Sequence, residues 1–210
     1  FSGQMVMNSM GAEKENKTLE TLLTMPVKRS TIVAAKLIGS ASIGLLGAGL
    51  YTVSMYYYQS SLTGGAASSV LSLGMADYAI VGVSIFLSLV GVLALSLVLG
   101  IFAGDRQGAQ MLLFPISILA IVPMFATMFT DVTRLSLPIR AILFAIPFTH
   151  PVIAPKRLLL GDLPMVVGGI VYEAIFAAAM IWLAIRVFNS DRLVTGSSGR
   201  LGRWLSRLQQ

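Results

Sequence analysis

Cysteine is absent from the sequence, and histidine occurs once, at position 150. The lack of thiols excludes disulfides, thiolate catalysis and cysteine-based metal sites. A lone imidazole lacks the second histidine of a usual zinc site, so we interpret His150 as part of a helix turn. Charged residues make up only 11% of the chain, against about 25% in a soluble domain. This scarcity of charge excludes a soluble globular protein.

Two common enzyme signatures are also absent. The sequence contains no Gly-x-x-x-x-Gly-Lys-Ser/Thr phosphate loop, so we do not expect this chain to hydrolyse ATP itself. It contains no His-Glu-x-x-His, which excludes the common intramembrane zinc protease. We therefore expect no catalytic residue, no metal site and no cofactor in this chain.

Apolar residues dominate instead: they make up 56% of the sequence, and the mean hydropathy is +0.83. A helix needs roughly 20 apolar residues to cross a bilayer. Residues 1–10 resemble the end of a preceding span, and because the chain begins at Phe1 we expect an upstream part to be missing. The predicted fold is an all-α polytopic membrane protein with four full spans, at about 31–58, 78–103, 111–130 and 164–188.

Basic residues are distributed unevenly between the two sides of this layout. Eleven of the fifteen lie in 11–30, in 104–110, in the tail 189–210, or at span ends as Lys36 and Arg186. The positive-inside rule places that side, and both visible ends of the chain, on the cytoplasmic face of a cell membrane. The net charge of +6 therefore indicates topology and lipid headgroups, not nucleic acid. Lys36 and Arg186 are expected to extend toward headgroups.

Residues 131–163 are too long for a simple outer loop. A helical run over 139–146 is closed by Pro147, and we expect Pro151 and Pro155 to break the chain again. Ten apolar residues cannot span, so the region is predicted to form a re-entrant or interfacial hairpin. An amphipathic surface loop is the alternative.

The tail 189–210 has apolar residues at i, i+3, i+4 and i+7, interleaved with arginines. This pattern is typical of an amphipathic helix on the inner leaflet, and a frayed tail is the open alternative. The apolar positions are Leu201, Trp204, Leu205 and Leu208.

Inside the spans, small residues recur every four positions, which lets helices approach closely. Gly44 and Ala48 belong to one such stripe, and Gly100 and Gly104 to another. Packing within the chain is one interpretation, and a dimer seam or cargo path is the other. Glu173 is the only acid deep within a span, on one helix face with Gly169 and Ala177, and is a transport candidate. A structural role beside a hydroxyl is its alternative.

The short segment 13–25 carries many charges for a connection between apolar segments. Glu13 and Lys17 are spaced for a helical ion pair, and Pro26 ends the pattern. An apolar stripe, Leu19, Leu22 and Leu23, runs opposite the charges. The helix could lie on the membrane with its leucines in lipid, or dock into a groove of a cytoplasmic partner.

This segment resembles the signature of type-2 ABC-transporter permeases. That signature is a Glu-x-Glu-x-x-Thr-Leu-Glu-x-Leu pattern, followed by a proline and then by a helix that opens with a lysine. Lys17 replaces the family's usual glycine, which favours continuous helix. A re-entrant pair before the last span and the exit Arg186-Val-Phe188 agree with the layout of that family. The matching positions are Glu13, Glu15, Thr18, Leu19, Glu20, Leu23, Pro26 and Lys36.

The resemblance implies a membrane subunit of an ATP-driven exporter, with the sodium or multidrug efflux branch as one candidate. Such subunits work as homo- or heterodimers, and each binds a separate ATPase subunit that carries the ATP and Mg. On that mapping Met10 ends the second span and 13–25 is the coupling helix. The implied partner-binding residues are Glu13, Glu15, Thr18, Leu19, Glu20, Leu22, Leu23 and Pro26.

The alternative function is an ion-coupled secondary transporter or channel-like protein that uses Glu173, with 13–25 resting on lipid. A membrane scaffold without transport is a third, weaker hypothesis. The sequence does not indicate the cargo.

Overall fold

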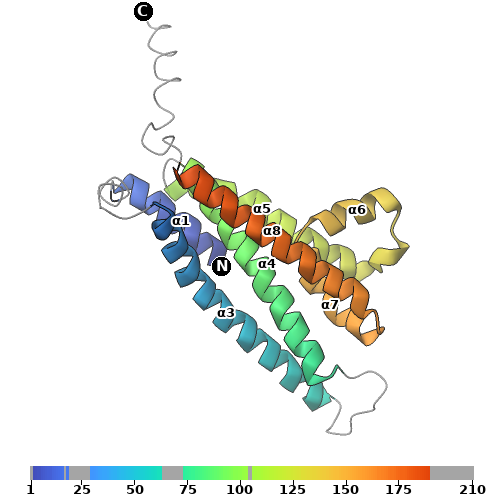
Figure 1. The fold of residues 1–210 in the computed structure, drawn as a ribbon. Helices are drawn as coiled ribbons and strands as arrows, with labels where there is room; N and C mark the ends of the chain where they lie inside the picture. Colours follow the sequence, from blue (N-terminus) through green and yellow to red (C-terminus); the bar gives the residue numbers. More distant parts are fainter. Residues whose placement is uncertain (1, 17, 19–28, 63–72, 104–105, 190–210) are drawn as a thin grey trace, which may run out of the picture.

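The computed structural model describes residues 2–16, 18, 29–62, 73–103 and 106–189 (Figure 1). Within these ranges the regular structure is helical and contains no strand. The elements are α1 (Ser2–Glu15), α3 (Arg29–Leu62), α4 (Met75–Phe102), α5 (Arg106–Phe129), a short 3-10 helix (Val132–Arg134), α6 (Leu137–Ala145), α7 (Thr149–Leu159) and α8 (Leu163–Asn189).

Four of the described helices are long and apolar enough to cross a membrane. Helices α6 and α7 meet at a bend of 113° and form either a re-entrant pair or one broken span. The predicted all-α polytopic fold is therefore confirmed. The candidate spans are Ser30–Tyr58, Met75–Phe102, Gln107–Phe129 and Leu163–Asn189.

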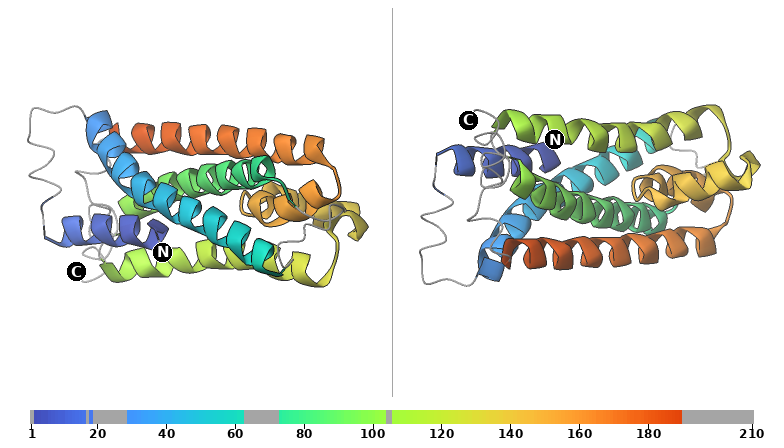
Figure 2. Two further views of the ribbon diagram at one scale, coloured as in Figure 1. Left: turned by 90° about the horizontal axis from the view of Figure 1, so that it is seen from below. Right: turned by 90° about the horizontal axis from the view of Figure 1, so that it is seen from above.

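Helix α4 lies at the centre of the bundle, with α3, α5 and α8 around it (Figure 2). In the most apolar stretch of α4, 56% of the residues are buried, against 11% in α5. The main core joins Leu93 and Leu97 of α4 to Met10 of α1, Val33 of α3 and Phe188 of α8. Helix α5 packs mainly against α1 and leaves most of its apolar surface uncovered by the described chain.

Glycines mark the closest helix approaches. A Cβ on Gly91 of α4 would lie 2.7 Å from the Phe176 ring and 3.6 Å from the Ala177 backbone of α8. Both predicted small-residue stripes contact helices of the same chain. Gly44 faces Leu89 of α4, and a Cβ on Gly100 would lie 3.1 Å from Met10. Ala48 is buried, and Gly104 lies outside the described residues.

Several element bounds differ from the sequence-based ones for local reasons. Helix α4 begins at Met75, not 78, because the Asp77 carboxylate accepts a hydrogen bond from Gly74 N at 2.8 Å and caps the first turn. The prolines of α7 do not break it, contrary to our expectation. Pro151 lies in the first turn, where backbone N–H groups have no helical partner, and Pro155 is accommodated inside the helix.

The boundary expected at Met10 is not a helix end, since α1 continues to Glu15. Gly11 and Ala12 interrupt neither its backbone nor its packing. Glu13 and Glu15 therefore belong to the same helix as the buried Met7 and Met10.

The bundle has two ends, which we name by what they carry. The connection end holds the C-terminus of α1, the start of α3, the end of α4, the start of α5 and the end of α8 (Figure 1). The hairpin end, at the opposite pole, carries α6 and α7. Helix α1 begins midway along the bundle and runs to the connection end (Figure 2).

Candidate functional site

The described part of the 13–36 motif lies at the connection end. Glu15 and Thr18 are exposed, and the Thr18 hydroxyl donates to the Glu13 carbonyl at 3.1 Å. Helix α1 ends at Glu15 and α3 begins at Arg29, so the segment between them is held by two packed helices. The other predicted partner-binding residues lie outside the described ranges: Leu19, Glu20, Leu22, Leu23 and Pro26.

Glu13 does not point to solvent but to α3. Its carboxylate forms an ion pair with Lys36 and accepts a hydrogen bond from Ser9 Oγ at 2.9 Å. The Lys36 side chain is only 18% exposed, so our expectation that it extends to headgroups is wrong. Lys17, the partner that helical spacing suggested for Glu13, lies outside the described residues, and the fold brings α3 against α1 and supplies Lys36 from 23 positions away.

Glu173 lies in the interface between α4 and α8 and is completely buried, as are Gly169 and Ala177 on the same face. Its Oε1 accepts a hydrogen bond from Ser84 Oγ at 3.0 Å, while Oε2 has no hydrogen-bond partner among the described residues. Glu173 forms no ion pair with any residue that the structure describes.

The turn between α6 and α7 is capped by side chains from α4, α7 and α8. Carbonyls at a helix end within membrane depth need such donors, because lipid supplies none. The donor and acceptor pairs are Thr149 with Leu143, His150 Nε2 with Phe144 (3.1 Å), Tyr172 with Ala145 (2.6 Å) and Ser88 with Pro147 (3.0 Å). Since a carbonyl only accepts, His150 Nε2 carries the proton. The turn role predicted for His150 agrees with this contact, and the described residues contain no group of three metal-ligating side chains.

A second charged cluster fastens α7 to the end of α5. Asp131 Oδ1 accepts a hydrogen bond from Arg157 Nη2 at 2.7 Å, and Oδ2 lies 3.1 Å from Lys156 Nζ. The Arg157 side chain is 9% exposed, whereas Lys156 is 55% exposed. A cation as buried as Arg157 depends on its partner.

We predict that Asp131→Ala lowers the free energy of unfolding by roughly 3 kcal/mol, because it leaves the Arg157 charge buried without its partner. Thermal unfolding of the purified protein in detergent measures the loss. Lys156→Ala is the matched control and should cost under about 1 kcal/mol, since it removes only an exposed ion pair. Equal losses in the two variants would contradict this account of the cluster.

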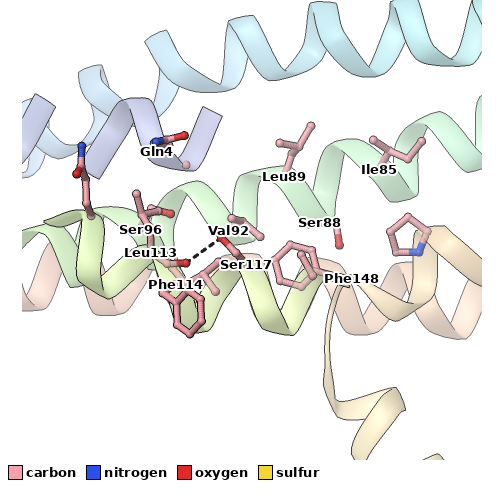
Figure 3. A pocket seen from close by; sticks show the side chains of 15 residues that line it. Gln4, Ile85, Ser88, Leu89, Val92, Ser96, Leu113, Phe114, Ser117 and Phe148 are labelled. Carbon is pink, nitrogen blue, oxygen red and sulfur yellow. Dashed lines mark hydrogen bonds between the residues drawn. The ribbon is translucent and has the colours of Figure 1, made fainter. Parts of the chain in front are cut away.

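A groove of about 670 Å³ lies between α1, α4, α5 and α7 (Figure 3). Its lining is mostly apolar and contains hydroxyl and amide groups but no charged side chain. Ser117 of the lining donates to the Leu113 carbonyl at 3.0 Å, and the buried Ser96 hydroxyl has no partner among the described residues. Gly3 and Gln4, in the first turn of α1, form one end of the groove. The chemistry of this lining identifies no particular ligand, so we do not assign the groove to cargo.

The chain has a match among known protein families. A family model described as ABC-2 family transporter protein matches residues 1–186. The chain belongs to the ABC-2 family. No curated protein and no solved structure matches it. The resemblance to type-2 ABC permeases seen in residues 13–36 is thereby confirmed, and this ABC-2 chain is a permease component and a multi-pass membrane protein.

The sequence located the motif but did not reveal the contacts of three residues. Ser84 and Ser88 of α4, which contact Glu173 and Pro147, stand four positions apart in an otherwise apolar run, and that spacing could have identified them. The role of Lys36 had no local signal, because its partner lies on another helix.

Proposed function

We propose that this ABC-2 permease couples ATP hydrolysis by a separate ATPase subunit to export across the cell membrane. The observation that carries the proposal is the position of the family motif at two helices, α1 and α3, whose facing ends both lie at one pole of the bundle. Eleven of the fifteen basic residues belong to that pole or to the tail after it, which supports a cytoplasmic connection end. ATP and Mg would be bound by the partner, which supplies the phosphate loop that this chain lacks.

In this proposal the segment 13–25 docks in a groove of the ATPase through its leucines. Helices α1 and α3 leave the segment on either side, so a displacement of the segment moves both. Such coupling requires that the segment contact the partner differently in the two nucleotide states. Helix α4, at the centre of the bundle, would carry the motion to α8 through the close contact at Gly91.

We also propose that two permease chains pair, as is usual for the family. Helix α5 supports this, because large apolar side chains along it are exposed and polar ones are few. Lipid would cover whatever part of this surface the second chain does not. The exposed side chains include Met111, Phe114, Ile118, Val122, Phe125 and Met128.

The experiment that tests the proposal is co-expression of the permease with a candidate ABC ATPase. Co-purification, together with ATP hydrolysis that rises when the permease is present, is the expected result. Failure of every ATPase from the same genome to co-purify would overturn the proposal.

Glu173 supports a second candidate function, an ion-coupled transporter, because a fully buried acid has an oxygen without a hydrogen-bond partner among the described residues. We predict a structural role instead. Glu173→Gln keeps an acceptor for Ser84 and should leave permease-dependent ATP hydrolysis unchanged while lowering stability by about 1 kcal/mol. Two measurements test this prediction. One is ATP hydrolysis by the assembled complex, and the other is monovalent-cation flux in liposomes that contain the permease alone. Cation flux without ATP that Glu173→Gln abolishes would favour the second candidate.

A further inference from the structure

The contact between α1 and α3 is unlike the other contacts of α1. A cavity of about 230 Å³ separates the two helices, lined on the α3 side by Ala35, Gly39 and Ser40 and on the α1 side by Met5 and Val6. This space is open to the surface, since Met5 and Gly39 are exposed, and it leaves the two helices with fewer contacts to resist relative movement than a close-packed interface would have. The interface between α1 and α3 is therefore compliant along the length of the cavity.

The contact between α1 and α4 is close by comparison. A Cβ on Gly3 would lie 2.7 Å from Ser96 Oγ, and one on Gly100 would lie 3.1 Å from Met10. Met7 and Met10 are fully buried. Helix α1 should consequently move with α4, while its packing against α3 is confined to the shared core at Val33 and Leu37 and leaves room for polar contacts to set the spacing.

A polar bridge closes the cavity at the connection end. Lys36 and Ser9 line the cavity, and Glu13 binds both of them, one turn of α1 beyond Ser9. Lys36 Nζ also lies 3.5 Å from Ser9 Oγ. With side chains 18% and 22% exposed, the Lys36 and Glu13 charges are partly shielded from solvent, so their attraction exceeds that of a surface pair. The bridge is the polar link between α1 and α3 in the described residues.

Both members of the pair belong to the family motif, yet neither side chain points toward the position that an ATPase subunit would occupy. Glu13 lies two residues before the end of α1, and Lys36 lies two turns into α3. Between these positions runs the segment proposed to dock on the ATPase. The separation of its two attachment points thus depends on this ion pair in addition to the shared core at Val33 and Leu37.

We propose that Glu13 and Lys36 are positioning residues for coupling: their ion pair holds the ends of α1 and α3 at the spacing through which the ATPase drives the permease. The inference rests on the proposed function and adds to it the residues that transmit force after docking. Loss of the pair leaves the leucines free to bind, but the movement of the docked segment is then absorbed at the cavity and no longer delivered to α3.

The test uses the complete permease in complex with its ATPase, reconstituted in liposomes. Glu13→Lys and Lys36→Glu, each alone, should retain co-purification but lower permease-dependent ATP hydrolysis at least fivefold. The double variant, which restores an ion pair with the charges exchanged, should recover at least half of the activity. Lys156→Gln, which removes an ion pair at the hairpin end, is the control and should hydrolyse ATP as the unaltered complex does.

A second measurement separates positioning from simple stabilisation. Because the sequence lacks cysteine, single cysteines at positions 16 and 30 can carry spin labels without a background signal. The distance distribution between them should be narrow in the unaltered permease, broad in either single variant and narrow again in the double variant. Thermal stability alone would not produce that restored distance.

Two results would overturn the inference. One is unchanged ATP hydrolysis in both single variants with the ATPase bound. The other is a double variant no better than the single ones, since each residue would then act separately. If no ATPase binds even the unaltered permease, the proposed function fails first, and the coupling role fails with it.

Discussion

Leu19→Asp combined with Leu23→Asp is expected to abolish co-purification of the ATPase while the permease still inserts into the membrane. Burying a leucine side chain is worth about 1.5–3 kcal/mol, and aspartate adds the cost of removing a charge from water. The double change should therefore remove more than about 5 kcal/mol of binding free energy, over a thousandfold in affinity. The measurement is pull-down of the ATPase by tagged permease from detergent extracts.

A matched control lies in the same segment. On the predicted helix, Thr21 and Thr24 lie opposite the leucine stripe, so Thr21→Asp with Thr24→Asp adds the same charge to the other face. That variant should retain the ATPase. Equal loss in the two pairs would mean that charge alone, and not the leucine face, decides binding, and retention by both would reject docking through the leucines.

Gly169→Leu is expected to destabilise the protein strongly by overpacking the contact between α7 and α8. A Cβ at this position would lie 2.8 Å from His150 Nδ1 and 3.2 Å from His150 Cβ, an atom that cannot move without α7. Overpacking of this kind costs about 1–3 kcal/mol. Displacing the His150 ring also removes its hydrogen bond to the Phe144 carbonyl, which lowers the stability by a further amount of about 1 kcal/mol. At about 2–4 °C per kcal/mol, the midpoint of thermal unfolding should fall by roughly 5–15 °C.

The neighbouring glycine provides the control for this change. A Cβ on Gly168 would meet no atom within 4 Å, so Gly168→Leu places the same side chain at the same depth without the clash. Its midpoint should stay within about 2 °C of the unaltered protein, a change well under 1 kcal/mol. A similar fall in both variants would show that the turn between α6 and α7 is not held by His150 against α8.

Hydropathy was sufficient to locate the four spans, because each is a long apolar run bounded by polar residues. It failed at the boundaries where polar residues belong to the helix. Asp77 was treated as loop on account of its charge, although that charge caps the first turn of α4. The same limit hid the length of α7, since the rule that proline breaks helices does not apply in a first turn such as that of Pro151.

The candidate site could be predicted only where its signal is local. Glu173 was expected to face protein because Gly169 and Ala177 share its helix face, and the structure buries all three. The four-residue spacing of Ser84 and Ser88 marks both as candidates, but the contact of Ser84 with Glu173 could not be derived, because the pairing of α4 with α8 depends on tertiary packing. Glu13 shows the same limit, since its contact with Lys36 joins two helices and has no signal in the local spacing.

The central claim is that the segment between α1 and α3 is gripped by the ATPase during turnover. A single cysteine in place of Leu22, in this cysteine-free chain, can carry a benzophenone crosslinker in proteoliposomes that are hydrolysing ATP. The account predicts a photo-adduct with the ATPase subunit whose yield changes when a nonhydrolysable ATP analogue replaces ATP. Adducts formed with lipid alone, in liposomes where hydrolysis continues, would contradict it.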